Sequence, residues 1–156
     1  MKLTVQTDYA LRVLMHVGLQ DGALVRVTEV AESYAISRHH LTKVVHRLGG
    51  LGYLTTVQGR HGGITLATAP ERIVVGQVVR DMEADLAVVE CLGATTSCPI
   101  APCCRLKRAM RDASSAFLGA LDEVTLADLL QPRRSLQRSL GLSPTPSGRR
   151  ARHAES

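Results

Sequence analysis

The chain has 156 residues, enough for one domain with a real hydrophobic core and a short extra segment. Hydrophobic residues make up 45% of the sequence but aromatic residues only 3%, which predicts an aliphatic core and argues against single-strand nucleic-acid binding through base stacking. The net charge of +5 comes mainly from residues 131–156, where six Arg accompany one acid, so the charge alone does not indicate a DNA-binding domain.

The N-terminal apolar run does not have the pattern of a targeting segment. Asp8, Arg12 and His16 interrupt it, whereas a signal peptide has an uninterrupted apolar centre. The sequence also has no run of about 18 apolar residues that could span a membrane. We therefore expect a cytoplasmic protein with no membrane partner, in a compartment where thiols stay reduced.

Two helices are expected at the N-terminus. The first covers Thr7–Leu19, where apolar residues recur at helical spacing, and Thr7 or Asp8 could cap it. A turn and a short extended link follow. The second helix is expected over Thr28–Tyr34, with Thr28 as its cap.

A third helix is expected over Arg38–Gly49, with Ser37 as its cap. Its apolar residues are spaced i, i+3, i+4, i+7, which predicts a buried stripe of Leu41, Val44, Val45 and Leu48. Two helices joined by a tight turn, the second basic on its exposed face, are a helix-turn-helix arrangement, although an ordinary solvated helix face gives the same pattern. The polar face is formed by Arg38, His39, His40, Thr42, Lys43, His46 and Arg47.

A β-hairpin is expected directly after this helix. Residues 52–57 and 64–67 have strand-like sequences, and the glycine-rich turn between them places Arg60 and His61 at the tip. A hairpin in this position is typical of the wing of a winged helix. The third helix would then enter the major groove of DNA, while Arg60 would reach phosphate or the minor groove. The alternative is a solvent-exposed turn in which glycine serves geometry alone.

The C-terminal half is expected to be helical. A helix over 74–82 precedes an acidic stretch, and a longer helix follows Cys104. That longer helix has apolar residues spaced four, three, four, three, the pattern of a heptad seam, which could pack on a partner or on the chain's own core. We favour a dimerisation seam, because a DNA-binding protein with one helix-turn-helix usually needs two-fold symmetry. The seam consists of Leu106, Met110, Ala113, Phe117 and Ala120.

The expected organisation has three parts. Residues 1–70 form a DNA-binding region, and residues 71–130 hold the cysteines and the long helix. A short helix over Thr125–Leu130 ends the second part. Residues 131–156, rich in Arg, Pro and Ser, are predicted to be a disordered tail.

All four cysteines lie between Cys91 and Cys104, in the sequence CLGATTSCPIAPCC. Six residues separate Cys91 from Cys98, and five separate Cys98 from Cys104. Disulfides do not fit a reducing compartment, and structural zinc sites usually contain a tighter Cys pair. A wide loop with soft thiolate ligands suits an iron–sulfur cluster, but the spacing leaves zinc and disulfides open.

The chain resembles the Rrf-two family of winged-helix regulators, and within it the nitric-oxide-sensing NsrR-type repressors. The resemblance runs from Met1 to about Leu130. It rests on the opening KLTVQTDYALRVLM, the helix SRHHLTKVVHRL, the hairpin GYLTTVQGRHGGITL, the segment VVRDMEADLAVVEC and the ending CRLKRAMRDASSAFLGALDEVTLADLL. It implies a fold that is mainly α with a small β-hairpin wing: a winged helix-turn-helix plus a long dimerisation helix.

The resemblance also implies a ligand set. The family's three Cys ligands match Cys91, Cys98 and Cys104, and an Asp near the first helix ligates from the other subunit, which corresponds to Asp8. Arg12 would support Asp8, although the same pair could be a simple i,i+4 ion pair. The role of Cys103 stays open. Related assembly regulators use a His where this chain has Lys107, a difference that favours the nitric-oxide sensor.

These features together imply a homodimeric repressor that binds a palindromic double-stranded operator. Its iron–sulfur cluster, 4Fe–4S in its intact form with 2Fe–2S as the alternative, would sense nitric oxide, and nitrosylation would release the operator. The alternatives are a regulator of the same fold that answers iron or redox status, a DNA-binding module with structural zinc, and an electron carrier. We expect no enzymatic activity, because the sequence offers no nucleophile–base pair, phosphate loop or carboxylate dyad.

Overall fold

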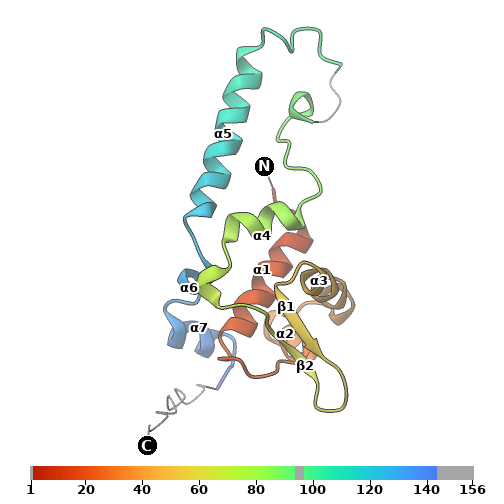
Figure 1. Ribbon diagram of the computed structural model, residues 1–156, viewed down its shortest axis with the longest axis vertical. Helices are drawn as coiled ribbons and strands as arrows, with labels where there is room; N and C mark the ends of the chain where they lie inside the picture. The colour runs from red at the N-terminus through yellow and green to blue at the C-terminus, as the bar shows by residue number, and fades with distance from the viewer. Residues whose placement is uncertain (1, 94–96, 144–156) are drawn as a thin grey trace, which may run out of the picture.

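The structure, a computed structural model, describes residues 2–93 and 97–143. It shows a group of helices with a small β-hairpin at its edge and one long helix projecting away from them (Figure 1). The cysteine-bearing segment joins α4 to the far end of that long helix. In chain order the elements are α1 (Val5–Gly18), α2 (Val27–Tyr34), α3 (Arg38–Gly50), β1 (Leu54–Val57), β2 (Gly63–Leu66), η1 (Pro70–Arg72), α4 (Val75–Met82), η2 (Glu90–Leu92), α5 (Arg105–Asp122), α6 (Leu126–Leu129) and α7 (Arg133–Ser139).

The core forms where α1 packs against α3. Leu14 of α1 and Leu41 and Leu48 of α3 are completely buried. The stripe predicted for α3 is confirmed, because the buried residues of this helix are the four that the spacing indicated. Truncation of a core leucine such as Leu41 to Ala typically costs about 2–5 kcal/mol, so this stripe fixes α3 on the body of the protein.

The first helix begins earlier than its sequence suggests. Thr4 is extended and caps α1, and its hydroxyl accepts a 3.3 Å hydrogen bond from the backbone N–H of Thr7. The prediction that Thr7 or Asp8 caps the helix is therefore wrong, because Thr7 already lies inside it and is fully buried. Ser37 does occupy the cap position of α3, although within the described residues its side chain makes no capping hydrogen bond.

The hairpin is held against the body at its second strand. Strands β1 and β2 pair antiparallel, with Leu54 opposite Leu66. Val25 and Ile64 exchange backbone hydrogen bonds of 2.9 and 2.8 Å, which attach β2 to the link before α2. A Cβ atom on Gly63 would lie 2.7 Å from the Val25 carbonyl oxygen, so this approach requires glycine.

The long helix α5 extends away from the core. Its C-terminal end packs against α4, where the Arg80 guanidinium binds the Asp122 carboxylate through two hydrogen bonds of 2.5 and 2.7 Å. Within the described part of the chain, none of its 18 residues is buried, so α5 does not pack along its own chain's core. Neither α5 nor any other helix of residues 2–93 and 97–143 combines the length and apolarity needed to cross a membrane.

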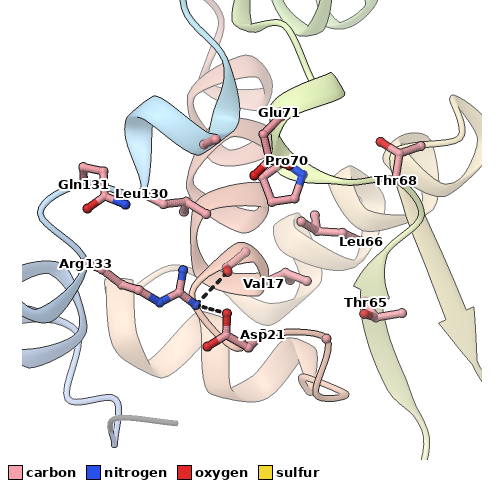
Figure 2. Close-up of a pocket in the computed structure, with 13 residues that line it drawn as sticks. Val17, Asp21, Thr65, Leu66, Thr68, Pro70, Glu71, Leu130, Gln131 and Arg133 are labelled. Carbon is pink, nitrogen blue, oxygen red and sulfur yellow. Dashed lines mark hydrogen bonds and ion pairs between the residues drawn. The ribbon is translucent and has the colours of Figure 1, made fainter. Parts of the chain in front are cut away.

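The prediction of a disordered tail from residue 131 onward is wrong for residues 131–143. Helix α7 lies against the C-terminal end of α1 beside a cavity of about 440 Å³ (Figure 2). Arg133 donates to the carbonyl oxygens of Gly18 and Leu19, at 3.2 and 2.9 Å, and to the Asp21 carboxylate at 2.5 Å. Gln137 is buried and donates to the same Leu19 carbonyl at 3.1 Å. Residues 144–156 of the predicted tail lie outside the described residues.

Candidate nucleic-acid interface and metal centre

The polar face of α3 is exposed as a continuous surface. Because the apolar stripe fixes the opposite side of the helix on α1, the polar side chains point away from the body. Six of the residues predicted to contact DNA on this helix are exposed, namely Arg38, His39, His40, Thr42, Lys43 and His46, and Ser37 is exposed just before it. This face offers positive charge and hydrogen-bond donors, the chemistry that double-stranded DNA requires.

Arg47 differs from the rest of this predicted face. It is half-buried, and its guanidinium donates to the backbone carbonyl of Asp81 at 2.8 Å and to the Gln6 side chain at 3.5 Å. The side chain is thus turned towards α4 and α1. The structure therefore does not support Arg47 as a residue that contacts a DNA groove, because its guanidinium already donates hydrogen bonds within the protein.

The tip of the hairpin carries the other two predicted DNA contacts. Arg60 and His61 are both exposed between β1 and β2. The turn depends on Gly62, because a Cβ atom there would lie only 2.1 Å from the Val57 carbonyl oxygen. The hairpin follows α3 directly, and the two lie on the same side of the molecule in Figure 1. This arrangement of helix and hairpin is that of a winged helix-turn-helix.

We refer to α3, Tyr53 and the β1–β2 hairpin together as the DNA-reading unit. The acidic residues at the end of α4 bind this unit and the start of α1, and the sequence did not reveal these contacts. Asp81 accepts a 2.6 Å hydrogen bond from the Tyr53 hydroxyl, just before β1. Burial, together with this hydrogen bond and the nearby Asp81 charge, raises the pKa of Tyr53 well above its usual range. The acidic stretch was recognisable, but its partners lie far away in the sequence.

Glu83 binds the start of α1 in the same way. Its carboxylate accepts hydrogen bonds from the Thr7 hydroxyl at 2.6 Å, the Thr4 backbone N–H at 2.7 Å and the Thr4 hydroxyl at 3.1 Å. Burial alone would raise the pKa of Glu83, but the hydrogen bonds from Thr7 and Thr4 outweigh it and lower the pKa. The start of α1 is thus held at the point where the chain leaves α4 for the cysteines.

Asp8 and Arg12 form the ion pair that their i,i+4 spacing allows. The charged atoms lie 3.0 Å apart, and both side chains are about half exposed. The Arg12 guanidinium also lies over the ring of Tyr34, 5.6 Å from its centroid. Arg12 therefore holds Asp8 at the surface of α1, where the carboxylate is accessible to another molecule.

The cysteines lie at both ends of an open segment. Cys91 is in η2 and Cys104 occupies the N-cap position of α5, and both are half-buried, whereas Cys98 and Cys103 are exposed. Part of the loop, residues 94–96, lies outside the described residues. Across residues 2–93 and 97–143, the structure does not bring three or more His, Cys, Asp or Glu side chains together as a metal site. One chain alone therefore does not assemble the predicted ligand set.

The surroundings of Cys104 nevertheless fit an anionic metal cluster. A cavity of about 570 Å³ lies beside Cys103 and Cys104 and is lined by four cationic residues, Arg105, Lys107, Arg108 and Arg111. Thiolate-ligated iron–sulfur clusters carry negative charge, which cationic side chains offset, and soft thiolates are their usual ligands. The thiol ligands and the positive charge of this segment thus both fit an iron–sulfur cluster.

Comparison with known proteins places these features in context. A family model described as Rrf2, iron-dependent transcriptional regulator, matches residues 3–132. The chain is 48% identical over 139 residues to the HTH-type transcriptional regulator NsrR of Geobacillus kaustophilus, covering 88% of this chain and 95% of that protein. It is 45% identical over 142 residues to the regulator of the same name from Bacillus subtilis, covering 90% of this chain and 97% of that protein.

The fold has counterparts among solved structures. The structure of T. potens IscR matches with a TM-score of 0.69 at 23% identity, covering 88% of this chain and 91% of that one. At this identity the likeness shows the fold alone. It confirms the predicted fold class, mainly helical with a winged helix-turn-helix.

Proposed function

The chain belongs to the Rrf2 family of transcriptional regulators, and from this premise we propose that it is a dimeric repressor that releases its operator when nitric oxide reacts with a bound iron–sulfur cluster. The observation that carries the proposal is the position of the cysteine segment. It joins α4, which holds the DNA-reading unit, to α5, a helix in which no residue is buried by the described part of the chain. The resemblance to NsrR-type regulators supplies the signal, nitric oxide.

The exposed face of α3 supports direct reading of double-stranded DNA. Arg38, His39, His40, Thr42, Lys43 and His46 would enter the major groove, with Ser37 at the start of the helix. Arg60 and His61 at the wing tip would bind phosphates or the adjacent minor groove. One such unit contacts a single half-site, so a palindromic operator requires two copies.

The surface of α5 supports a homodimer as the source of the second copy. The helix is 18 residues long, which corresponds to about 27 Å, and Leu106 in its predicted seam is 60% exposed. Met110 and Phe117 lie in the same seam and are only partly covered by their own chain. A second α5 packed along this seam would remove the apolar surface from water and fix the distance between the two readers.

The cluster would be held by Cys91, Cys98 and Cys104 of one subunit and by Asp8 of the partner subunit. When bound, the cluster supplies iron that nitric oxide attacks. The three thiolates would hold it firmly, and the carboxylate, a harder ligand, would leave its iron more open. Arg12 orients Asp8 through their 3.0 Å ion pair. A 4Fe–4S cluster is our proposal for the intact form, with 2Fe–2S as the alternative.

Loss of the Asp8 ligand would be transmitted through α1. This helix packs against α3, so its position sets the position of the recognition surface. In a dimer the two recognition helices must fit half-sites about 34–36 Å apart, which tolerates little change in spacing. If Asp8 of the partner subunit were no longer bound to the cluster, the population would shift to arrangements with a different spacing, and the operator affinity would fall.

The decisive experiment is anaerobic purification followed by absorption spectroscopy and operator binding during a titration with nitric oxide. A brown protein that bleaches and releases its operator at a few nitric oxide molecules per cluster supports the proposal. A colourless zinc protein, or a brown protein whose DNA binding ignores nitric oxide, contradicts it and favours the zinc or iron-status alternatives.

Two neighbouring thiols provide the matched variants for this test. Cys104→Ala removes a proposed ligand and should abolish the cluster absorption. Cys103→Ala changes an exposed thiol whose Sγ lies 3.5 Å from the Ile100 carbonyl oxygen, and should leave the absorption in place. The reverse result would assign the third thiolate to Cys103.

A further inference from the structure

Two adjacent residues at the end of α4 bind opposite parts of the protein. Arg80 binds Asp122 on α5 through two hydrogen bonds of 2.5 and 2.7 Å. Asp81 instead accepts the Tyr53 hydroxyl at 2.6 Å, and its backbone carbonyl accepts Arg47 of α3 at 2.8 Å. Helix α5, which follows the cysteine segment, and the DNA-reading unit are therefore bound at consecutive positions of one short helix.

Tyr53 joins the recognition helix to the wing through its backbone. Its N–H donates to the Leu48 carbonyl of α3 at 3.0 Å, and its own carbonyl accepts the Ala67 N–H at 3.0 Å, just beyond β2. A displacement of Tyr53 thus moves the end of α3 and the base of the hairpin together. The contact of its hydroxyl with Asp81 is what ties this joint to α4.

Helix α4 is a firm base for these contacts. Val78, Val79 and Met82 are buried in the core, so the Asp81 backbone cannot shift without disturbing the packing of α1. The Tyr53–Asp81 distance is in the short range typical of hydroxyl-to-carboxylate hydrogen bonds. Both side chains are half-buried, which reduces competition from water.

We propose that Asp81 is a positioning residue that holds α3 and the wing at one fixed angle to α4, and thereby, through Arg80 and Asp122, to α5, the helix that follows the cysteine segment. This inference rests on the proposed function, because it concerns how the state of the cysteine segment reaches the DNA. The route through Asp81 lies within one subunit and is separate from the route through Asp8 of the partner subunit.

The test compares substitutions of two residues that donate hydrogen bonds to the same Asp81 carboxylate. Tyr53→Phe keeps the ring and removes only the hydroxyl that binds Asp81. Gln77→Ala is the matched control, because the Gln77 amide also donates to the Asp81 carboxylate, at 2.8 Å. Gln77 lies on α4 itself, and among the described residues its side chain makes no hydrogen bond to the DNA-reading unit. Operator affinity is measured for each protein with its cluster loaded and after cluster removal.

We expect Tyr53→Phe to lower the operator affinity of the loaded dimer about tenfold, roughly the effect of losing one hydrogen bond to a charged group. The operator affinity of the cluster-free protein should change little, so the ratio of cluster-loaded to cluster-free affinity should fall. Gln77→Ala should keep the wild-type ratio. The inference would be overturned if Tyr53→Phe lowered the operator affinity equally with and without the cluster. It would also be overturned if Gln77→Ala lowered the ratio of the two affinities as much as Tyr53→Phe.

Hydrogen exchange supplies a readout that does not depend on DNA or on the cluster. In the cluster-free protein, Tyr53→Phe should speed amide exchange in α3 and in both hairpin strands, while Gln77→Ala should not. Unchanged exchange in these elements would also overturn the inference. Failure of the proposed function has a different signature, since the wild-type operator affinity would then be the same with and without the cluster, and both proposals would fall.

Discussion

The Thr7 hydroxyl donates a 2.6 Å hydrogen bond to the Glu83 carboxylate, although the two residues are 76 positions apart in the chain. This contact joins the start of α1, which carries Asp8, to the segment that leads from α4 to Cys91. We propose both Asp8 and Cys91 as cluster ligands. Within each subunit, the Thr7–Glu83 hydrogen bond thus anchors the segment that carries one of them to the segment that carries the other.

The Glu83 contacts predict a specific loss of stability in acid. The hydrogen bonds from Thr7 and Thr4 lower the pKa of Glu83 in the folded protein, so their contribution is present above the unfolded-state pKa of about 4.5 and is lost as the pH falls through the lower, folded-state value. Glu83→Gln should lower the free energy of unfolding by about 1–3 kcal/mol at pH 7. The variant should then lose less of that free energy than the wild type as the pH falls below 4.5. Urea unfolding at pH 7, 5 and 3 measures this, with the exposed Glu32→Gln on α2 as control. Equal pH dependence in wild type and Glu83→Gln would contradict it.

The exposed face of α3 predicts a particular salt dependence. Lys43 is exposed and makes no ion pair among the described residues, so its ammonium group is available to a DNA phosphate. Lys43→Ala should weaken operator binding and reduce the slope of log affinity against log salt by about 1. Fluorescence anisotropy across a salt series measures the slope. Arg72→Ala, an exposed cation in η1 and outside the reading unit, should leave the slope unchanged.

The features that the sequence could predict are those set by local periodicity. The buried stripe of α3 follows from four apolar residues at helical spacing, and the hairpin follows from two short strands around a glycine-rich turn. Arg47 shows where periodicity fails. Its position places it on the polar face, but the long side chain turns back to Asp81, a partner that only the folded chain brings near.

The cysteine segment and the C-terminal helix show two further limits. Cysteine spacing predicts soft ligands but not their arrangement. Among residues 2–93 and 97–143, no three potential metal ligands come together, although Cys91 and Cys104 begin and end the cysteine segment. The C-terminal residues have a composition typical of disorder. The overlooked signal was Leu136 and Leu140 at i,i+4, which pack against the core beside the buried Gln137.

The buried His16 predicts a loss of stability just below neutral pH. Its side chain is fully buried, and neither ring nitrogen has a hydrogen-bond partner among the described residues. Burial lowers the pKa of His16, and the Glu29 charge opposes this only in part. The unfolded chain therefore takes up a proton near pH 6.5 while the folded chain resists it, so the free energy of unfolding should fall as the pH drops below about 6.5.

Replacement of the titrating group tests this directly. His16→Phe keeps an aromatic ring against Tyr34. In the cluster-free protein, it should reduce the fall in the free energy of unfolding between pH 7.5 and 5.5. His46→Asn, at an exposed position of α3, is the control and should retain the wild-type dependence. A wild-type protein with equal stability at both pH values would show that His16 is not held neutral in the fold.

The contacts of Arg133 predict that the C-terminal helix is part of the folded domain. Its guanidinium serves two backbone carbonyls at the end of α1 and the Asp21 carboxylate, whereas the neighbouring Arg134 is exposed. Arg133→Ala leaves those partly buried acceptors without their donor and should lower the free energy of unfolding by about 1–3 kcal/mol, while Arg134→Ala should change it by less than about 0.5 kcal/mol. Urea denaturation of both variants measures the difference. A disordered segment would give two equal, negligible effects, so a clear asymmetry between these adjacent arginines distinguishes a docked helix from a charged tail.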